Sequence, residues 1–376
     1  RIRYIMINIV VTGAGGFIGK NLCVALQGMD QVNLKRIYSH TPEKAILDCL
    51  SDANYIYHLA GVNRPKDIDE FEKGNVEFTL KILDACARSI IPPTIIFSSS
   101  IQAEFDNVYG RSKLDAEKLL IDYSIRYSIN AVIYRLPGVF GKWSRPNYNS
   151  VVSTFCYNVA NMKDIQISDP DLKLTLVYVD DVIDSFLGQI DQRNMGVKFE
   201  NVSPEYNTTL GDLGEAIESF PLIRKSLLLP DMSNELKKRL YSTYLTYLNT
   251  SDFSYDLELK KDNRGDLFEW IKSSSFGQVF VSTTKPGVTR GNHFHHLKTE
   301  KFLVIRGEAE IKFRSVLSEE VVVYAVSGDS PKVLDIPPGY THSITNTGND
   351  ELITLFWANE IFDRENSDTV IFKVTE

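Results

Sequence analysis

The sequence lacks the features that mark membrane, secreted and nucleic-acid-binding proteins. No apolar run approaches the ~18 residues that a transmembrane helix needs, so we expect no membrane partner. The four cysteines, Cys23, Cys49, Cys86 and Cys156, form no CxxC pair, which indicates free thiols in a reducing, cytoplasmic setting. A net charge of −8 argues against nonspecific binding to nucleic acid. At 376 residues, two domains are expected, because single cores stop growing below that size.

The N-terminal half alternates between β-branched runs and helical patterns. Residues 7–12, INIVVT, are typical of a strand that is buried on both faces. Further strands are predicted at 33–38, 54–59, 94–99 and 131–135, and helical patterns lie at 74–88 and 111–127. Strands that alternate with helices predict an α/β domain with a doubly wound parallel sheet.

A glycine-rich turn follows the first strand directly, in the stretch VVTGAGGFIGKNL. Gly13, Gly16 and Gly19 let such a turn tighten and let its backbone approach a pyrophosphate at the start of the next helix. A glycine triplet alone fits a plain tight turn equally well. Its place straight after the first strand favours a dinucleotide site.

A tyrosine and a lysine lie four residues apart in YGRSK, at the start of a predicted helix. Tyr109 and Lys113 therefore share one helix face. A nearby ammonium group favours the phenolate, and a tyrosine with a lowered pKa exchanges a proton readily near neutral pH. The chain has 18 tyrosines, so this spacing by itself is no proof of function.

The end of the second predicted strand is basic. The stretch LKRIYSHTPEK contains Lys35, Arg36, His40 and Thr41 but no early acid to accept a hydrogen bond from a ribose 2′-hydroxyl. This composition favours NADPH, whose 2′-phosphate is anionic. A solvated basic surface with no cofactor role is the alternative.

From about residue 253 the pattern changes. Short predicted strands are separated by glycine and proline, as in GQVFVSTT, EKFLVIRGEAEIKFR and KVLDIPPG. Such punctuation predicts an all-β sandwich or barrel. The chain therefore combines an α/β half with an all-β half.

A cluster of histidines lies in the all-β half. In GNHFHHLKTEKFLVIRG, His293 and His295 alternate along one strand and project to the same face, and Glu300 follows after a short turn. A second stretch, PPGYTHSITN, adds His342. Imidazole nitrogens with one carboxylate suit a divalent metal such as zinc. His296 should face away from its neighbours, toward solvent.

The N-terminal motifs, in this order, resemble the extended short-chain dehydrogenase/reductase family over about residues 7–245. YHLAGV, IIFSSS, YRLPGVFG and LVYVDDV match as well. The resemblance implies a Rossmann-like domain with catalytic Ser100, Tyr109 and Lys113. Ser100 precedes Tyr109 by only nine positions, which is a shorter spacing than the family usually shows. Ser99 is therefore the alternative, as a substrate-binding or catalytic serine. The cofactor residues implied are Gly13, Gly16, Phe17, Ile18, Gly19, Arg36, His40, Leu59, Ala60 and Lys113.

The two histidine stretches resemble the signature motifs of the cupin family, which implies a jelly-roll barrel over about 253–376 with a metal held by His293, His295, Glu300 and His342. GVTRGNHFH also looks like a strand of nucleotide-linked 4-keto-6-deoxyhexose epimerases. Under that match Arg290 contacts substrate, and His293 is a proton-abstracting base instead of a ligand. Those epimerases usually lack a metal. This chain also has His295, Glu300 and His342, and their presence favours a site that binds one.

Together the halves resemble the CapF-like family of bifunctional capsular polysaccharide enzymes. The resemblance implies a reductase domain over 6–250 and a cupin domain over 253–376. The cupin would epimerise carbon 3 of a UDP-linked 2-acetamido-4-keto-2,6-dideoxyhexose, and the reductase would then reduce carbon 4 with NADPH, toward UDP-N-acetyl-L-fucosamine. The alternatives are a sugar-sensing or dimerising cupin without catalysis, and a 4-epimerase or dehydratase with bound NAD. A homodimer is expected.

Overall fold

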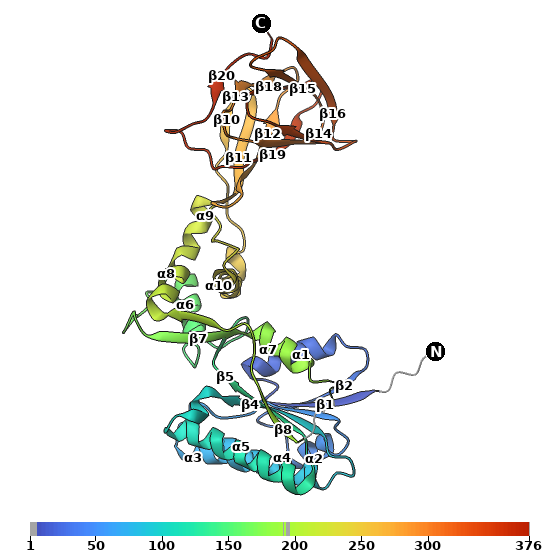
Figure 1. The fold of residues 1–376 in the computed structure, drawn as a ribbon, viewed down its shortest axis with the longest axis vertical. Coiled ribbons are helices and arrows are strands. Elements are labelled where there is room, and N and C mark those ends of the chain that lie inside the picture. Colours follow the sequence, from blue (N-terminus) through green and yellow to red (C-terminus); the bar gives the residue numbers. More distant parts are fainter. Residues whose placement is uncertain (1–5, 191, 193–195, 376) are drawn as a thin grey trace. The chain divides into compact units, whose positions relative to one another are not determined.

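The computed structural model describes residues 6–190, 192 and 196–375, which fall into two compact units (Figure 1). The first unit comprises the chain through Glu218 together with Arg239–Leu248, and the second comprises Ser219–Lys238 and the chain from Asn249 onward. The segment Ser219–Lys238 thus groups with the second unit, ahead of the predicted boundary near residue 250. Each unit has its own hydrophobic core.

The first unit is built on a parallel sheet with the strand order β2-β1-β3-β4-β5-β8. Its strands are β1 (Ile7–Thr12), β2 (Val32–Ile37), β3 (Tyr55–His58), β4 (Thr94–Ser100), β5 (Ala131–Leu136) and β8 (Val197–Glu200). A small second sheet joins β6 (Gly138–Phe140), β7 (Lys173–Tyr178) and β9 (Tyr206–Thr209). The structure confirms the predicted doubly wound, Rossmann-like architecture.

Helices cover both faces of the large sheet. The cluster that contains Ile9 and Val11 packs against α1 (Phe17–Gln27) and α7 (Val179–Leu187). Val10 points the other way, toward α2 (Glu43–Leu50), α4 (Phe78–Ala87) and α5 (Val108–Tyr127) (Figure 1). Successive residues of a strand face opposite sides, so a run such as INIVVT can be apolar throughout only when both faces are covered.

The other helices are shorter or lie away from the large sheet. They are α3 (Asp69–Phe71), the π-helix η1 (Glu72–Glu77), α6 (Val151–Ala160), α8 (Leu210–Ser219), α9 (Ile223–Ser226), α10 (Glu235–Leu245) and the 3₁₀-helices η2 (Ile101–Glu104), η3 (Phe220–Leu222) and η4 (Thr250–Asp252). No helix in residues 6–190, 192 and 196–375 combines the length and the apolar character that crossing a membrane requires. All four cysteines are free thiols.

The glycine turn after β1 is imposed by close backbone contacts. Gly13 has a φ of +67°, and a Cβ at this position would lie 2.7 Å from the backbone nitrogen of Ala60. A Cβ on Gly19 would lie 2.1 Å from the carbonyl oxygen of Gly13. Any larger residue would push the turn away from the 59–62 loop or from the start of α1. Gly13 and Gly19 therefore allow the turn to pack closely against the 59–62 loop and the start of α1.

The second unit contains two packed antiparallel sheets. One has the order β10-β11-β12-β19-β14-β17, and the other β16-β15-β18-β13-β20. Their bounds are β10 (Lys260–Asp262), β11 (Gly265–Ser273), β12 (Gly277–Thr284), β13 (Thr289–Phe294), β14 (Glu300–Arg306), β15 (Glu308–Ser315), β16 (Val321–Ser327), β17 (Val333–Ile336), β18 (Tyr340–Asn346), β19 (Leu352–Ala358) and β20 (Val370–Ile371). Phe302 and Phe356 from one sheet meet Ile311 and Ile344 from the other. This arrangement agrees with the predicted cupin jelly roll.

Candidate active sites

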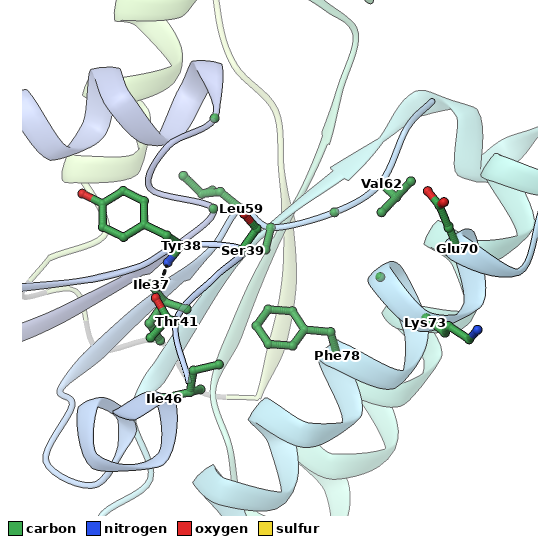
Figure 2. Close-up of a pocket in the computed structure, with 15 residues that line it drawn as sticks. Ile37, Tyr38, Ser39, Thr41, Ile46, Leu59, Val62, Glu70, Lys73 and Phe78 are labelled. Carbon is green, nitrogen blue, oxygen red and sulfur yellow. Dashed lines mark hydrogen bonds between the residues drawn. The ribbon is translucent and has the colours of Figure 1, made fainter. Parts of the chain in front are cut away.

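A cavity of about 500 Å³ opens at the carboxyl ends of β1, β2 and β3. Its wall contains the predicted cofactor residues Gly13, Gly16, Leu59 and Ala60. Figure 2 shows Tyr38 on one side of the cavity and Glu70 and Lys73 on the other. Ligands of doubly wound sheets bind outside the carboxyl ends of the strands, and the glycine turn at the start of α1 suits a pyrophosphate. The cavity therefore has the position and the lining of a dinucleotide site.

The end of β2 presents different residues from those predicted. Tyr38, Ser39 and Thr41 line the cavity, whereas Arg36 and His40 lie outside its wall as the structure describes it. The Arg36 side chain lies beside Cys23 and opposes the rise that burial causes in the pKa of its thiol, and His40 stacks on Tyr38 with ring centroids 5.6 Å apart. Position just past a strand end could have indicated Tyr38 and Ser39. Lys73 lies on the π-helix and had no signal in the sequence.

The predicted catalytic groups meet where β4 ends and α5 begins. The Tyr109 hydroxyl lies close enough to the Ser100 side chain for that side chain to lower the pKa of the phenol. Between them η2 reverses the chain tightly, and a Cβ on Gly110 would lie 2.1 Å from the carbonyl oxygen of Gln102. That close approach explains how only nine positions can separate the serine from the tyrosine.

Lys113 lies one helical turn beyond Tyr109, with its ammonium group 2.8 Å from the carbonyl oxygen of Ser98. Burial lowers the pKa of Lys113 to about 8, against a smaller opposing effect of Glu117. Burial also raises the pKa of Tyr109, with the Ser100 side chain acting in the opposite direction. The predicted lowering of the Tyr109 pKa is therefore wrong for the protein without cofactor, because desolvation outweighs the effect of Ser100. The phenol is protonated at neutral pH.

Ser99 belongs to a buried polar network. Its hydroxyl donates to Glu117 Oε1 at 2.5 Å, and Arg135 binds the same carboxylate through Nε at 3.1 Å and Nη2 at 2.6 Å. Glu104, which is exposed, accepts a hydrogen bond from Arg135 Nη1 at 2.9 Å. Because Ser99 is committed to this network and Ser100 contacts Tyr109, the geometry favours Ser100 as the serine beside the reacting oxygen.

Asn75 on the π-helix joins the cofactor loop to α5, a link that the sequence did not reveal. Its Oδ1 accepts from the backbone nitrogen of Val62 at 2.7 Å, and its Nδ2 donates to the Val62 carbonyl and to Ser112 Oγ, each at 2.9 Å. His58 lies between the hydroxyls of Thr12 and Thr79, at 2.8 and 2.9 Å. Burial lowers the pKa of His58 to about 3, so the imidazole is neutral and packs within the core.

In the second unit the structure brings the four predicted ligands together. One candidate ligand atom from each of His293, His295, Glu300 and His342 lies within 4.8 Å of the others. His293 pairs with His342 across β13 and β18, next to a bulge in which Gly291 and Asn292 have φ values of +96° and +60°. The bulge re-aims the strand at this point. His296 is exposed, as predicted.

These four groups fit a divalent metal. Nδ1 of His295 lies 2.7 Å from the Asp368 carbonyl oxygen, and Nδ1 of His342 lies 3.2 Å from that of Tyr340. A proton on each Nδ1 leaves the Nε2 lone pairs free. Both Nε2 atoms are buried without a hydrogen-bond partner in the described part of the chain, although Glu300 Oε2 lies 3.4 and 3.3 Å away. A metal ion would satisfy them.

Asp368 supports the loop that carries the ligands. Its carboxylate accepts from the backbone nitrogens of His296, Leu297 and Lys298, at 3.0, 2.7 and 2.8 Å. Burial opposes ionisation, but these three donors outweigh it and hold the pKa of Asp368 at about 2. No sequence motif indicated this residue, because it lies some 70 positions away from the histidines.

Arg290 shares the inward face of β13 with His293. It lies opposite Ile344, which points into the core two residues beyond His342 on β18. Its Nε donates to Thr284 Oγ1 at 3.0 Å and its Nη2 to the Thr283 carbonyl at 2.9 Å. The guanidinium is therefore fixed against the end of β12.

Comparisons with known proteins cover both units. The NAD dependent epimerase/dehydratase family model matches residues 9–203, and the polysaccharide biosynthesis C-terminal domain model matches 260–370. A UDP-2-acetamido-2,6-beta-L-arabino-hexul-4-ose reductase of Pseudomonas aeruginosa is 41% identical over 368 residues, 98% of this chain and 99% of the relative. The capsular polysaccharide assembling protein CapF of Staphylococcus aureus is 44% identical with a TM-score of 0.91, over 98% of this chain and 100% of that chain.

A more distant structure covers about two thirds of the chain. A UDP-glucuronic acid 4-epimerase of Bacillus cereus, in complex with UDP-glucuronic acid and NAD, is 19% identical with a TM-score of 0.54. It covers 64% of this chain and 98% of its own. At this identity the likeness shows the fold alone.

The buried network predicts that replacing Glu117 lowers the stability of the protein more than replacing Glu104, the other glutamate that pairs with Arg135. Glu117→Gln removes a carboxylate that is 1% exposed, and we expect the free energy of unfolding to fall by about 2 kcal/mol. The loss should stay below that of a fully buried pair, because the Arg135 side chain is 26% exposed and keeps Glu104. Urea denaturation measures the effect.

Glu104→Gln is the matched control, since this side chain is 60% exposed and should cost less than about 1 kcal/mol. The transition of the first unit is identified as the one that added nicotinamide nucleotide shifts to higher urea. Equal effects of the two substitutions would show that the Glu117 network does not stabilise the site.

Proposed function

The chain belongs to the NAD dependent epimerase/dehydratase family, and we propose that it is a bifunctional sugar-nucleotide enzyme of capsular polysaccharide synthesis. Its substrate would be a UDP-linked 2-acetamido-4-keto-6-deoxyhexose, inverted at carbon 3 by the cupin domain and then reduced at carbon 4 by the reductase domain with NADPH. The full-length likeness to the Pseudomonas aeruginosa reductase carries this proposal. The functional domains are taken as 6–250 and 253–376, in a cytoplasmic homodimer.

In the reductase domain the chain's own residues bind the ketone and supply a proton. When bound, the nicotinamide supplies the hydride. Ser100 hydrogen-bonds the carbonyl oxygen, and Tyr109 donates its phenolic proton to that oxygen as negative charge develops on it. Burial raises the pKa of Tyr109, so the phenol is protonated at neutral pH and carries the proton that it would donate. Lys113 lies beside them, oriented by the Ser98 carbonyl.

In the cupin domain the ketone at carbon 4 acidifies the C–H bond at carbon 3. We assign His293 as the base, because burial lowers its pKa to about 4 and leaves a neutral imidazole. A zinc or similar ion held by His295, Glu300 and His342 would supply Lewis acidity, and the imidazole of His293 would then stay uncoordinated, because a base needs its free lone pair. Arg290 would contact the substrate. Epimerisation must precede reduction, since reduction removes the carbonyl that acidifies carbon 3.

Cofactor choice can be tested at the end of β2. The cavity wall there contains Tyr38, Ser39 and Thr41 and no carboxylate that would repel a 2′-phosphate. We expect kcat/KM for NADPH to exceed that for NADH by at least about tenfold, and Ser39→Asp to reverse the preference, since an acid accepts from the ribose 2′-hydroxyl. Steady-state rates with both cofactors give the ratio. Similar values for the unsubstituted protein would remove the NADPH assignment.

Metal content can be tested directly. Protein that has never met a chelator should carry about one divalent ion per chain, most often zinc, and His342→Ala should lose it. His296→Ala is the matched control, because His296 is exposed and adjacent but outside the cluster. Elemental analysis by mass spectrometry gives the stoichiometry. A metal-free native protein would leave His293 as a base without an ion.

The division of labour between the domains separates this proposal from a non-catalytic cupin. Tyr109→Phe should lower NADPH oxidation at least about a hundredfold, because the proton donor is gone, while exchange of the carbon 3 proton continues. His293→Ala should suppress exchange, and NADPH oxidation should fall with it. Time courses by NMR in D₂O, with the 4-keto sugar nucleotide as substrate, follow both steps.

Tyr127→Phe serves as the control, since Tyr127 is 46% exposed at the far end of α5. If Tyr109→Phe stops exchange while His293→Ala leaves it intact, the cupin is not the epimerase. The sensing or dimerising alternative would then replace the proposed one.

A further inference from the structure

Two exposed arginines from different loops of the first unit meet at one tyrosine ring. Arg64 follows β3, and Arg145 follows β6 in the 141–150 loop. Their guanidinium carbons lie 6.0 and 5.2 Å from the centre of the Tyr148 ring. Neither guanidinium makes a hydrogen bond or an ion pair with any residue that the structure describes. The two like charges therefore converge with no carboxylate between them.

The 141–150 loop is held in a strained conformation by several contacts. Trp143, a bulky and exposed residue, has a φ of +68°. Lys142 pairs with Asp180, and the Tyr247 hydroxyl donates to the Ser144 carbonyl at 2.6 Å. A left-handed conformation is unfavourable at a bulky residue and persists where surrounding contacts impose it, often at ligand sites. The loop is thus built to present its side chains in one arrangement.

The arginine pair lies near the catalytic groups. A Cβ on Gly61 would lie 3.3 Å from the Lys113 ammonium nitrogen. Arg64 follows Gly61 by three positions, so their Cα atoms are at most about 11 Å apart. Val62 between them is fixed to Asn75 by two hydrogen bonds. A ligand whose reacting carbon reaches Tyr109 and Lys113 can therefore extend to the arginines.

We propose that Arg64 and Arg145 bind the diphosphate of the sugar nucleotide, with Tyr148 of the 141–150 loop packed against both guanidinium groups. This inference rests on the proposed function. Guanidinium groups bind phosphate oxygens through paired hydrogen bonds, and bound anionic charge removes the repulsion between the two arginines. The cofactor's pyrophosphate has a separate place at the glycine turn before α1, so the second anion belongs to another ligand.

The test uses uridine diphosphate and NADPH as separate probes of the full-length protein. Arg64→Gln and Arg145→Gln should each raise the Kd for uridine diphosphate about tenfold, and the double variant about a hundredfold, as loss of charge-assisted hydrogen bonds predicts. The Kd for NADPH should stay within about twofold. Calorimetry measures the first ligand and fluorescence the second. Arg126→Gln is the control, an exposed arginine in the last turn of α5.

The outcomes distinguish this inference from the proposed function. If the unsubstituted protein binds uridine diphosphate and both variants bind it equally well, the arginine pair is a solvated surface and the inference is wrong. If NADPH binding weakens instead, the pair serves the cofactor's 2′-phosphate. If the unsubstituted protein binds NADPH but no uridine diphosphate, the nucleotide-sugar substrate itself is overturned.

Discussion

The reductase site depends on one buried carboxylate. Glu117 of α5 binds Ser99 of β4 and Arg135 of β5, and so fixes a helix to two neighbouring strands at the edge where ligands bind. Ser98 and Ser100 flank the anchored serine, one orienting Lys113 and the other contacting Tyr109. The relative positions of the three proposed reductase residues, Ser100, Tyr109 and Lys113, therefore follow from a residue that has no proposed role in the reaction. Paired charges of this kind define an arrangement even where their net contribution to stability is modest.

Each of the two units stabilises a buried charged group, a cation in the first unit and an anion in the second. Burial disfavours the charged form of Lys113 and lowers its pKa, and the carboxylate of Glu117, one helical turn away, partly offsets that effect. Around Glu300, burial opposes an anion, but protonated imidazoles of His295 and His342 lower its pKa to about 2, and a bound cation would take the place of the protons on their Nε2 atoms. Each site keeps one charged group in a poorly solvated place because a partner lies on a neighbouring element. Such perturbed groups are typical of functional sites.

Local pattern predicted the parts that are encoded locally. The β-branched run at β1, the glycine corner, the tyrosine and lysine one turn apart and the alternating histidines each follow from a short stretch. Contacts between distant segments were beyond such reasoning. Asn75 matters because Val62 and Ser112 face it, and Asp368 because the 296–298 backbone faces it. Arg36 and His40 remain predicted cofactor residues that do not line the cavity as described, because a basic composition does not say where side chains lie.

The support given by Asp368 has a consequence for the order of folding. The cluster needs β13, β14, β18 and a segment near the end of the sandwich to be in place together. Contacts between such distant segments form late, because loop closure is costly before they are made. Any ion that the cluster binds is therefore received by a nearly finished domain and not by a loose chain. Local opening of the Asp368 segment, more than unfolding of the barrel, would set how fast one ion exchanges for another.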